Sequence, residues 1–72
     1  MAVIVEAEDL LPGGHSERVA LDGVSSVGEA MARLPLKRST GIVILVNGKL
    51  GQFDTPLSDG DVVQLIPALG GG

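Results

Sequence analysis

The chain has 72 residues, of which 44% are hydrophobic and 19% charged, with 11 glycines, one aromatic residue and no cysteine. A chain of this length forms one domain with a small core, so a large internal substrate pocket is not expected. The absence of cysteine excludes disulfides and a catalytic thiol, and the single histidine, His15, cannot make a zinc site alone. The net charge of −4 disfavours nucleic-acid binding, which needs a basic surface.

No segment predicts insertion into a membrane. Apolar runs such as residues 42–46 are far shorter than the roughly 20 residues that span a bilayer. No charged leader precedes an apolar stretch with a cleavage site, so no secretory signal is visible. We therefore expect a cytoplasmic protein without a membrane partner.

Two strands joined by a turn are predicted for the first part of the chain. Residues 1–8 are rich in Val and Ile, and their alternation places Val3 and Val5 on one face and Ile4 on the other. A Pro-Gly-Gly turn follows, and a second strand is predicted over residues 17–21. Adjacent strands with a short connection predict a hairpin.

One short helix is predicted next. Ser26 stands three positions before Glu29, which is the spacing of a capping box. Glu29 and Arg33 are four positions apart, which predicts an ion pair on the exposed side. Pro35 disfavours helical geometry at the preceding residue, so the helix is expected to end at Leu34. The apolar stripe that would face the core consists of Val24, Val27, Met31 and Leu34.

The second half of the chain predicts a further set of strands. Residues 42–46 are apolar on both faces, as in a central strand or one whose outer face is used. An Asn-Gly pair then predicts a tight turn into a short extra strand. Residues 55–61 are dense in turn residues, and residues 62–67 form the last strand. Asp59 and Asp61 offer fewer oxygens than a calcium loop needs, so we interpret them as part of a turn that caps this strand.

These elements predict an α+β fold. Two hairpin-like halves around one helix cannot form the alternating units of a doubly wound sheet. A mixed sheet of four to five strands packed on the helix is expected, with the last strand parallel to the first near its middle, as in a ubiquitin-like β-grasp. Residues 1–69 would be the domain, and residues 70–72 a flexible glycine tail.

The outward face of the sheet is a candidate for partner binding. If Ile44 faces the helix, then Val43 and Leu45 face outward, close to Ile66 of the last strand, although the opposite parity stays open. An exposed apolar patch of this kind usually marks an interface. The residues predicted to contact partners are Val43, Leu45, Phe53, Ile66, Pro67 and Leu69.

The end of the chain carries a family resemblance. Residues 54–67 read DTPLSDGDVVQLIP, and the chain ends in Gly71-Gly72. A leucine-containing turn, Asp-Gly-Asp, a Val-rich strand and a terminal Gly-Gly in this order resemble the ThiS/MoaD sulfur carriers, and residues 46–49 (VNGK) also look like this family. The specific match covers about the last third of the chain, whereas the first 40 residues agree in pattern only.

The resemblance implies a carrier protein and not an enzyme by itself. An adenylyltransferase of the ubiquitin-activating type would use ATP to adenylate the Gly72 carboxylate, and sulfur from a persulfide would replace AMP to give a thiocarboxylate. Gly70 and Gly71 would thread the tail into the partner's site. The partner that takes up the sulfur would be the large subunit of molybdopterin synthase or thiazole synthase. The carrier is expected to hold no cofactor or metal of its own.

Two features of the tail leave alternatives open. The chain has three terminal glycines where the family minimum is two, so Gly70 is either functional or a spacer. Leu69 stands where ubiquitin has a basic residue, which gives less support to ubiquitin-type conjugation. Pro67 resembles the molybdopterin branch, but the choice between molybdopterin and thiamine stays open. The competing interpretations are a protein modifier, with Gly72 joined to a target lysine, and an interaction module with a passive tail.

Overall fold

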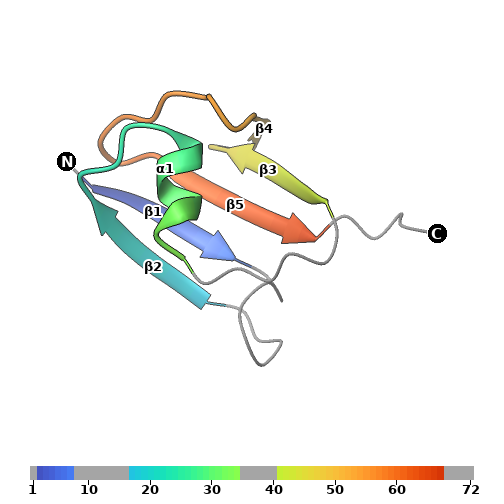
Figure 1. Ribbon diagram of the computed structural model, residues 1–72, viewed down its shortest axis with the longest axis horizontal. Coiled ribbons are helices and arrows are strands. Elements are labelled where there is room, and N and C mark those ends of the chain that lie inside the picture. Colours follow the sequence, from blue (N-terminus) through green and yellow to red (C-terminus); the bar gives the residue numbers. More distant parts are fainter. Residues whose placement is uncertain (1, 8–16, 35–40, 68–72) are drawn as a thin grey trace.

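The computed structural model describes residues 2–7, 17–34 and 41–67, which form one sheet with a helix across one face (Figure 1). The predicted turn between the first two strands, Leu69 and the glycine tail lie outside these residues. The elements in chain order are β1 (Ala2–Ala7), β2 (Glu17–Asp22), α1 (Val27–Ala32), β3 (Ile42–Val46), β4 (Lys49–Leu50) and β5 (Val62–Pro67).

The five strands form one mixed sheet in the order β2-β1-β5-β3-β4. β1 pairs antiparallel with β2 and parallel with β5, and β3 pairs antiparallel with both β5 and β4. The parallel pair formed by the first and last strands is therefore central, and the predicted β-grasp arrangement is confirmed. Within the described part of the chain, no helix is both long and apolar enough to cross a membrane.

The core lies between the sheet and α1 and contains only aliphatic side chains. Val3 and Val5 of β1 and Val63 and Leu65 of β5 are completely buried, because alternate residues of both central strands face the helix. Such small and branched side chains let a six-residue helix approach the sheet closely. The buried residues are Val3, Val5, Ala7, Val24, Val27, Ala30, Ile44, Leu57, Val63 and Leu65.

The start of α1 is fixed by the predicted cap. The Ser26 hydroxyl accepts a hydrogen bond from the Glu29 N–H at 3.2 Å, which satisfies a donor that a helix start leaves unpaired. α1 ends at Ala32 rather than at the predicted Leu34, although Leu34 still packs against the core. The helix stops there because Arg33, its C-cap, already donates its backbone N–H to the carbonyls of the last turn.

The predicted ion pair between Glu29 and Arg33 is wrong. The Glu29 carboxylate accepts hydrogen bonds from the Ser25 N–H at 3.0 Å and from the Ser25 hydroxyl at 3.1 Å. Arg33 instead donates to the Asp22 carbonyl oxygen at 3.1 Å, which ties the end of the helix to the end of β2. The unpaired amide ahead of the helix is a better partner for the carboxylate than an exposed arginine, because exposed ion pairs contribute little.

Candidate functional site

The strand that leads into the C-terminal tail lies in the middle of the sheet. β5 is hydrogen-bonded to β1 on one side and to β3 on the other, and Pro67 is its last residue. Among the described residues, the ladder with β1 reaches the Ala7–Leu65 pair, and Pro67, two positions further along, stands opposite Ile42 of β3. The sheet therefore holds the chain firmly up to the point where the tail begins.

The outward face beside the end of β5 is apolar. Val43 stands opposite Ile66, and Leu45 stands opposite both Gln64 of β5 and Leu50 of β4. Ile44 is buried while Val43 is 36% exposed, so the structure selects the parity in which Val43 and Leu45 face outward. We call the set Val43, Leu45, Leu50 and Ile66 the outward patch.

Leu50 is the member of the outward patch that sequence reasoning missed. It is 81% exposed, the largest value among the exposed large hydrophobic residues of the described chain. The signal was present, because a two-residue Asn-Gly turn pairs the residues on either side of it and places Leu50 opposite Leu45. Pairing the residues on the two sides of this turn in the sequence would have placed Leu50 beside Leu45.

The outward patch has a polar boundary on the side of β1. Gln64, the cross-strand neighbour of Leu45, is also opposite Glu6. Glu6 in turn forms an ion pair with Arg18 of β2, with 3.4 Å between the Arg18 Nε and the Glu6 Oε2. The outward face is thus apolar over β3 and β4, whereas on β1 and β2 it mixes this ion pair with Ile4 and Ala20. An apolar centre with a polar rim is the usual composition of a protein interface.

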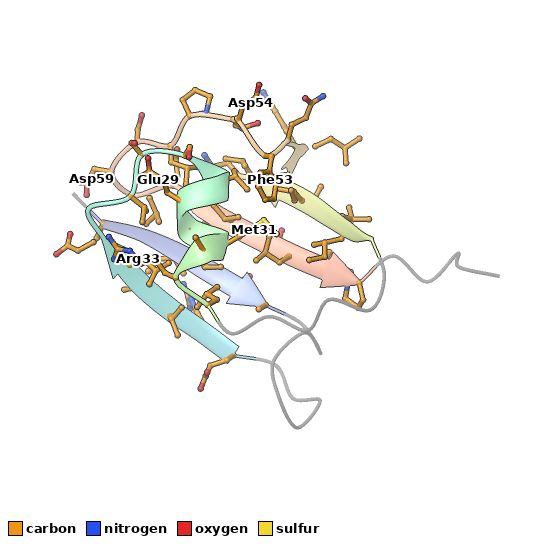
Figure 2. The ribbon with its side chains drawn as sticks, in the orientation of Figure 1. Glu29, Met31, Arg33, Phe53, Asp54 and Asp59 are labelled. Atoms are coloured by element: carbon orange, nitrogen blue, oxygen red, sulfur yellow. The ribbon has the colours of Figure 1, made fainter. Side chains whose placement is uncertain are left out.

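Phe53 lies apart from the outward patch. Its carbonyl oxygen accepts the Gly28 N–H at 2.8 Å, and a Cβ atom on Gly28 would be 3.2 Å from the ring. The ring therefore lies against α1, which covers the other face of the sheet (Figure 2). Phe53 is the only aromatic residue of the chain, and its exposed fraction is 64%. Of the predicted contact residues, the structure brings together Val43, Leu45 and Ile66.

A network of polar side chains fixes the opposite end of the sheet, where β1 and β5 begin and β3 ends (Figure 1). The Asn47 Oδ1 accepts the Val62 N–H at 2.9 Å, and the Asn47 Nδ2 donates to the Asp61 Oδ1 at 3.0 Å. The other Asp61 oxygen accepts the Ser58 N–H at 2.8 Å, and the Asp59 Oδ1 accepts the Ala2 N–H at 2.7 Å. We call these residues the Asn47 corner. The interpretation of both aspartates as turn residues is confirmed.

The electrostatics of the Asn47 corner follow from its hydrogen bonds. The backbone hydrogen bond from Ser58 and then the side-chain hydrogen bond from Asn47 hold the pKa of Asp61 below its ordinary value of 3.8. Both bonds favour the ionised carboxylate, and they outweigh the smaller opposing effect of desolvation. Nowhere in the described ranges do three or more His, Cys, Asp or Glu residues gather to hold a metal ion. This corner is a structural element of the sheet.

The fold and the outward patch together define a small ubiquitin-like β-grasp protein that presents an interface beside its C-terminal strand. The model of the ThiS family matches residues 4–72, and the chain belongs to this family. Proteins of this family are small carriers or subunits and are not catalytic by themselves. The match reaches the terminal glycines and so includes the tail that the described residues do not.

Two solved structures are similar to this chain over the full length of both chains. SAMP1 from Haloferax volcanii is 21% identical with a TM-score of 0.67, which supports the fold alone. A complex of subunits 1 and 2 of molybdopterin-converting factor from Helicobacter pylori 26695 contains a chain that is 30% identical, with a TM-score of 0.63. The search of curated proteins finds no match.

Proposed function

We propose that this chain carries sulfur on its C-terminus, as a thiocarboxylate formed at Gly72. The observation that carries the proposal is the position of the outward patch at the end of the central strand that leads to the glycines. A partner bound to this patch would have the tail within reach of its own active site. The family match over residues 4–72 supports the same assignment.

The chemistry requires activation of the terminal carboxylate, because a carboxylate has a poor leaving group. In the proposed sequence a Gly72 oxygen attacks the α-phosphorus of ATP, pyrophosphate leaves, and an acyl-adenylate forms on a partner adenylyltransferase. A persulfide sulfur then attacks the carbonyl carbon and AMP leaves. A thiol breaks the remaining S–S bond and releases the thiocarboxylate. Each step uses groups of the partner, so the carrier contributes only the acyl group.

Two features of the sequence suit this role. Gly70 and Gly71 carry no side chains, so the tail can enter a passage too narrow for other residues. The chain also has no cysteine, so an activated C-terminus cannot be captured as an internal thioester.

The sulfur acceptor is the finer part of the proposal. The Helicobacter pylori neighbour is a complex of two subunits of molybdopterin-converting factor. By likeness to it, we propose the large subunit of molybdopterin synthase as the partner that covers the outward patch. Thiazole synthase is the alternative. Either partner would place the carrier in the cytoplasm.

The direct test is to incubate the purified chain with its cognate adenylyltransferase, ATP and a sulfide source and to measure its intact mass. Replacement of one oxygen by sulfur adds about 16 Da, located at Gly72 by fragmentation. A variant without Gly71-Gly72 is the control and should gain nothing. An unchanged mass of the full chain under conditions that thiolate a known carrier would refute the proposal. Lysine-linked adducts in place of the thiocarboxylate would indicate a protein modifier. Deletion of Gly70 alone would show whether it is more than a spacer.

A further inference from the structure

Asn47 is the only asparagine in the chain, and a glycine follows it. The amide nitrogen of a glycine is unhindered, so it attacks a preceding asparagine side chain more readily than that of any residue with a Cβ. We propose that Asn47 is a deamidation site that the Asn47 corner keeps closed through Asp61, and that its conversion loosens the end of the sheet where β1, β3 and β5 meet. This inference is independent of the proposed sulfur chemistry.

The reaction needs a specific movement of the Asn47 side chain. Its Cγ atom must turn toward the backbone nitrogen of Gly48. In the structure both polar atoms of the side chain are held elsewhere, because Oδ1 accepts the Val62 N–H at 2.9 Å and Nδ2 donates to Asp61 at 3.0 Å. The Asn47 N–H is also fixed, on the Val62 carbonyl oxygen at 2.8 Å. Deamidation therefore requires that two side-chain hydrogen bonds break first.

Asp61 is the part of this restraint that a substitution can remove. One carboxylate oxygen accepts the Asn47 amide, and the other accepts the Ser58 N–H at 2.8 Å, so the carboxylate cannot rotate away. Asn47 is exposed, and water can reach it as soon as the side chain is released. The rate of modification is thus set by how firmly Asp61 holds the amide.

The chemical step is balanced without any redox partner. The Gly48 nitrogen attacks the Asn47 Cγ and loses its proton, the Cγ–Nδ2 bond breaks, and the side-chain nitrogen leaves as ammonia. Water then opens the cyclic imide at either carbonyl. One opening gives aspartate, and the other gives isoaspartate, in which the main chain runs through the side-chain carbon.

Both products disturb the Asn47 corner. The side chain of an aspartate at position 47 has no N–H to donate, and its carboxylate faces that of Asp61 where a hydrogen bond of 3.0 Å stood before. An isoaspartate adds an atom to the backbone of the two-residue turn that sets the Val46–Lys49 register. Either product also adds one negative charge to the net charge of −4.

The first test compares the native chain with the chain in concentrated urea at 37 °C and mildly alkaline pH. Deamidation adds about 1 Da, whereas isomerisation of the Asp-Gly pairs leaves the mass unchanged. Fragmentation assigns the added mass to Asn47. We expect the native chain to react at least roughly tenfold more slowly, as expected when two ordinary hydrogen bonds must break. Equal rates in both conditions would overturn the proposal.

The second test uses a matched pair of variants. Asp61→Ala removes the acceptor of the Asn47 amide, whereas Asp59→Ala removes a carboxylate of the same corner whose partner among the described residues is the Ala2 N–H and not Asn47. Deamidation should be roughly fivefold faster in Asp61→Ala, as expected for one lost hydrogen bond, and unchanged in Asp59→Ala. Equal acceleration in both would mean that general loosening controls the rate, and the role of Asp61 would be refuted.

A third measurement keeps the proposal testable if Asp61→Ala does not fold. Asn47→Asp reproduces one product, and its urea midpoint should be lower than that of the unmodified chain. Asn47→Asp combined with Asp61→Asn restores a donor opposite the new carboxylate and should recover part of the loss. No recovery would show that the two carboxylates do not repel each other, contrary to the proposed consequence.

Discussion

The two ends of β5 differ in what holds them. At its start, the Val62 N–H is bound by the Asn47 side chain, Asp61 accepts the Ser58 N–H within its own turn, and Asp59 accepts the Ala2 N–H of β1. At its end, Ile66 lies beside Val43 in the apolar outward patch, and no side-chain hydrogen bond is found at either residue in the described chain. One end is polar and internally bonded, and the other is apolar and open on its outer face.

This difference shows how so small a domain can combine a fixed frame with an exposed interface. Hydrogen bonds from exposed side chains fix the register of β1, β3 and β5 without using apolar area. The apolar residues at the other end of β5 are then available to a partner. Fixing the frame far from the tail also lets the tail end be altered with little effect on folding.

The largest expected effect is the loss of partner binding in Leu45→Glu. A charge in the centre of an apolar interface should weaken binding to the sulfur-accepting synthase by roughly 100-fold or more, measured by calorimetry. Ala20→Glu is the matched control, because it adds the same charge to the same face of the sheet on the distant strand β2. Urea unfolding of both variants should stay close to that of the parent. Unfolding of Leu45→Glu would show instead that the outward patch belongs to the core.

At the other end of β5, Asn47 should affect stability and not binding. Asn47→Gly keeps the backbone free to adopt the observed φ of 53° but removes both side-chain hydrogen bonds. This variant should lower the free energy of unfolding by about 1–2 kcal/mol. Asn47→Ala should cost about 1 kcal/mol more because of the strained φ. Urea midpoints measure both. If Asn47→Gly were as stable as the parent, the corner would not be fixing the sheet.

Much of this architecture could be predicted from local signals. The alternation in β1, the Ser26 cap and the Asn-Gly turn each act over a few residues, and the sheet order follows from packing such elements around one helix. The outward direction of Leu45 was only one of two parities that the sequence left open, and the burial of Ile44 decides between them.

The rest depends on contacts between residues distant in sequence. Asn47 and Asp61 are 14 positions apart, and neither reveals the other. Phe53 was grouped with the outward residues because it is apolar, but the backbone hydrogen bond between its carbonyl and Gly28 draws its loop to the helix. Short-range patterns carry no information about such a bond. The assignment of the C-terminal glycines as a tail rests on the sequence alone, because they lie outside the described residues.

Stability in acid should depend on Asp61. The pKa of Asp61 in the folded state lies below its ordinary value of 3.8, so folding favours the ionised carboxylate. This contribution to stability is fully present at a pH above the unfolded-state pKa. It is lost as the pH falls through the folded-state pKa. Urea midpoints should therefore begin to fall below about pH 5 and continue to fall toward pH 2. In Asp61→Asn this part of the pH dependence should disappear. An unchanged acid profile in the variant would assign the loss to other carboxylates.

The smallest expected effect is that of Phe53→Ser. Because the ring is 64% exposed and lies against Gly28, its loss should lower the free energy of unfolding by less than about 1 kcal/mol. Leu57→Ser, at a buried position reached through the same loop, should cost several times as much. Affinity for the synthase should also change by less than about twofold, because Phe53 is on the helix side of the sheet. A large loss of affinity would extend the interface around the edge formed by β4, and the contrast between the two ends of β5 would then no longer describe where partners bind.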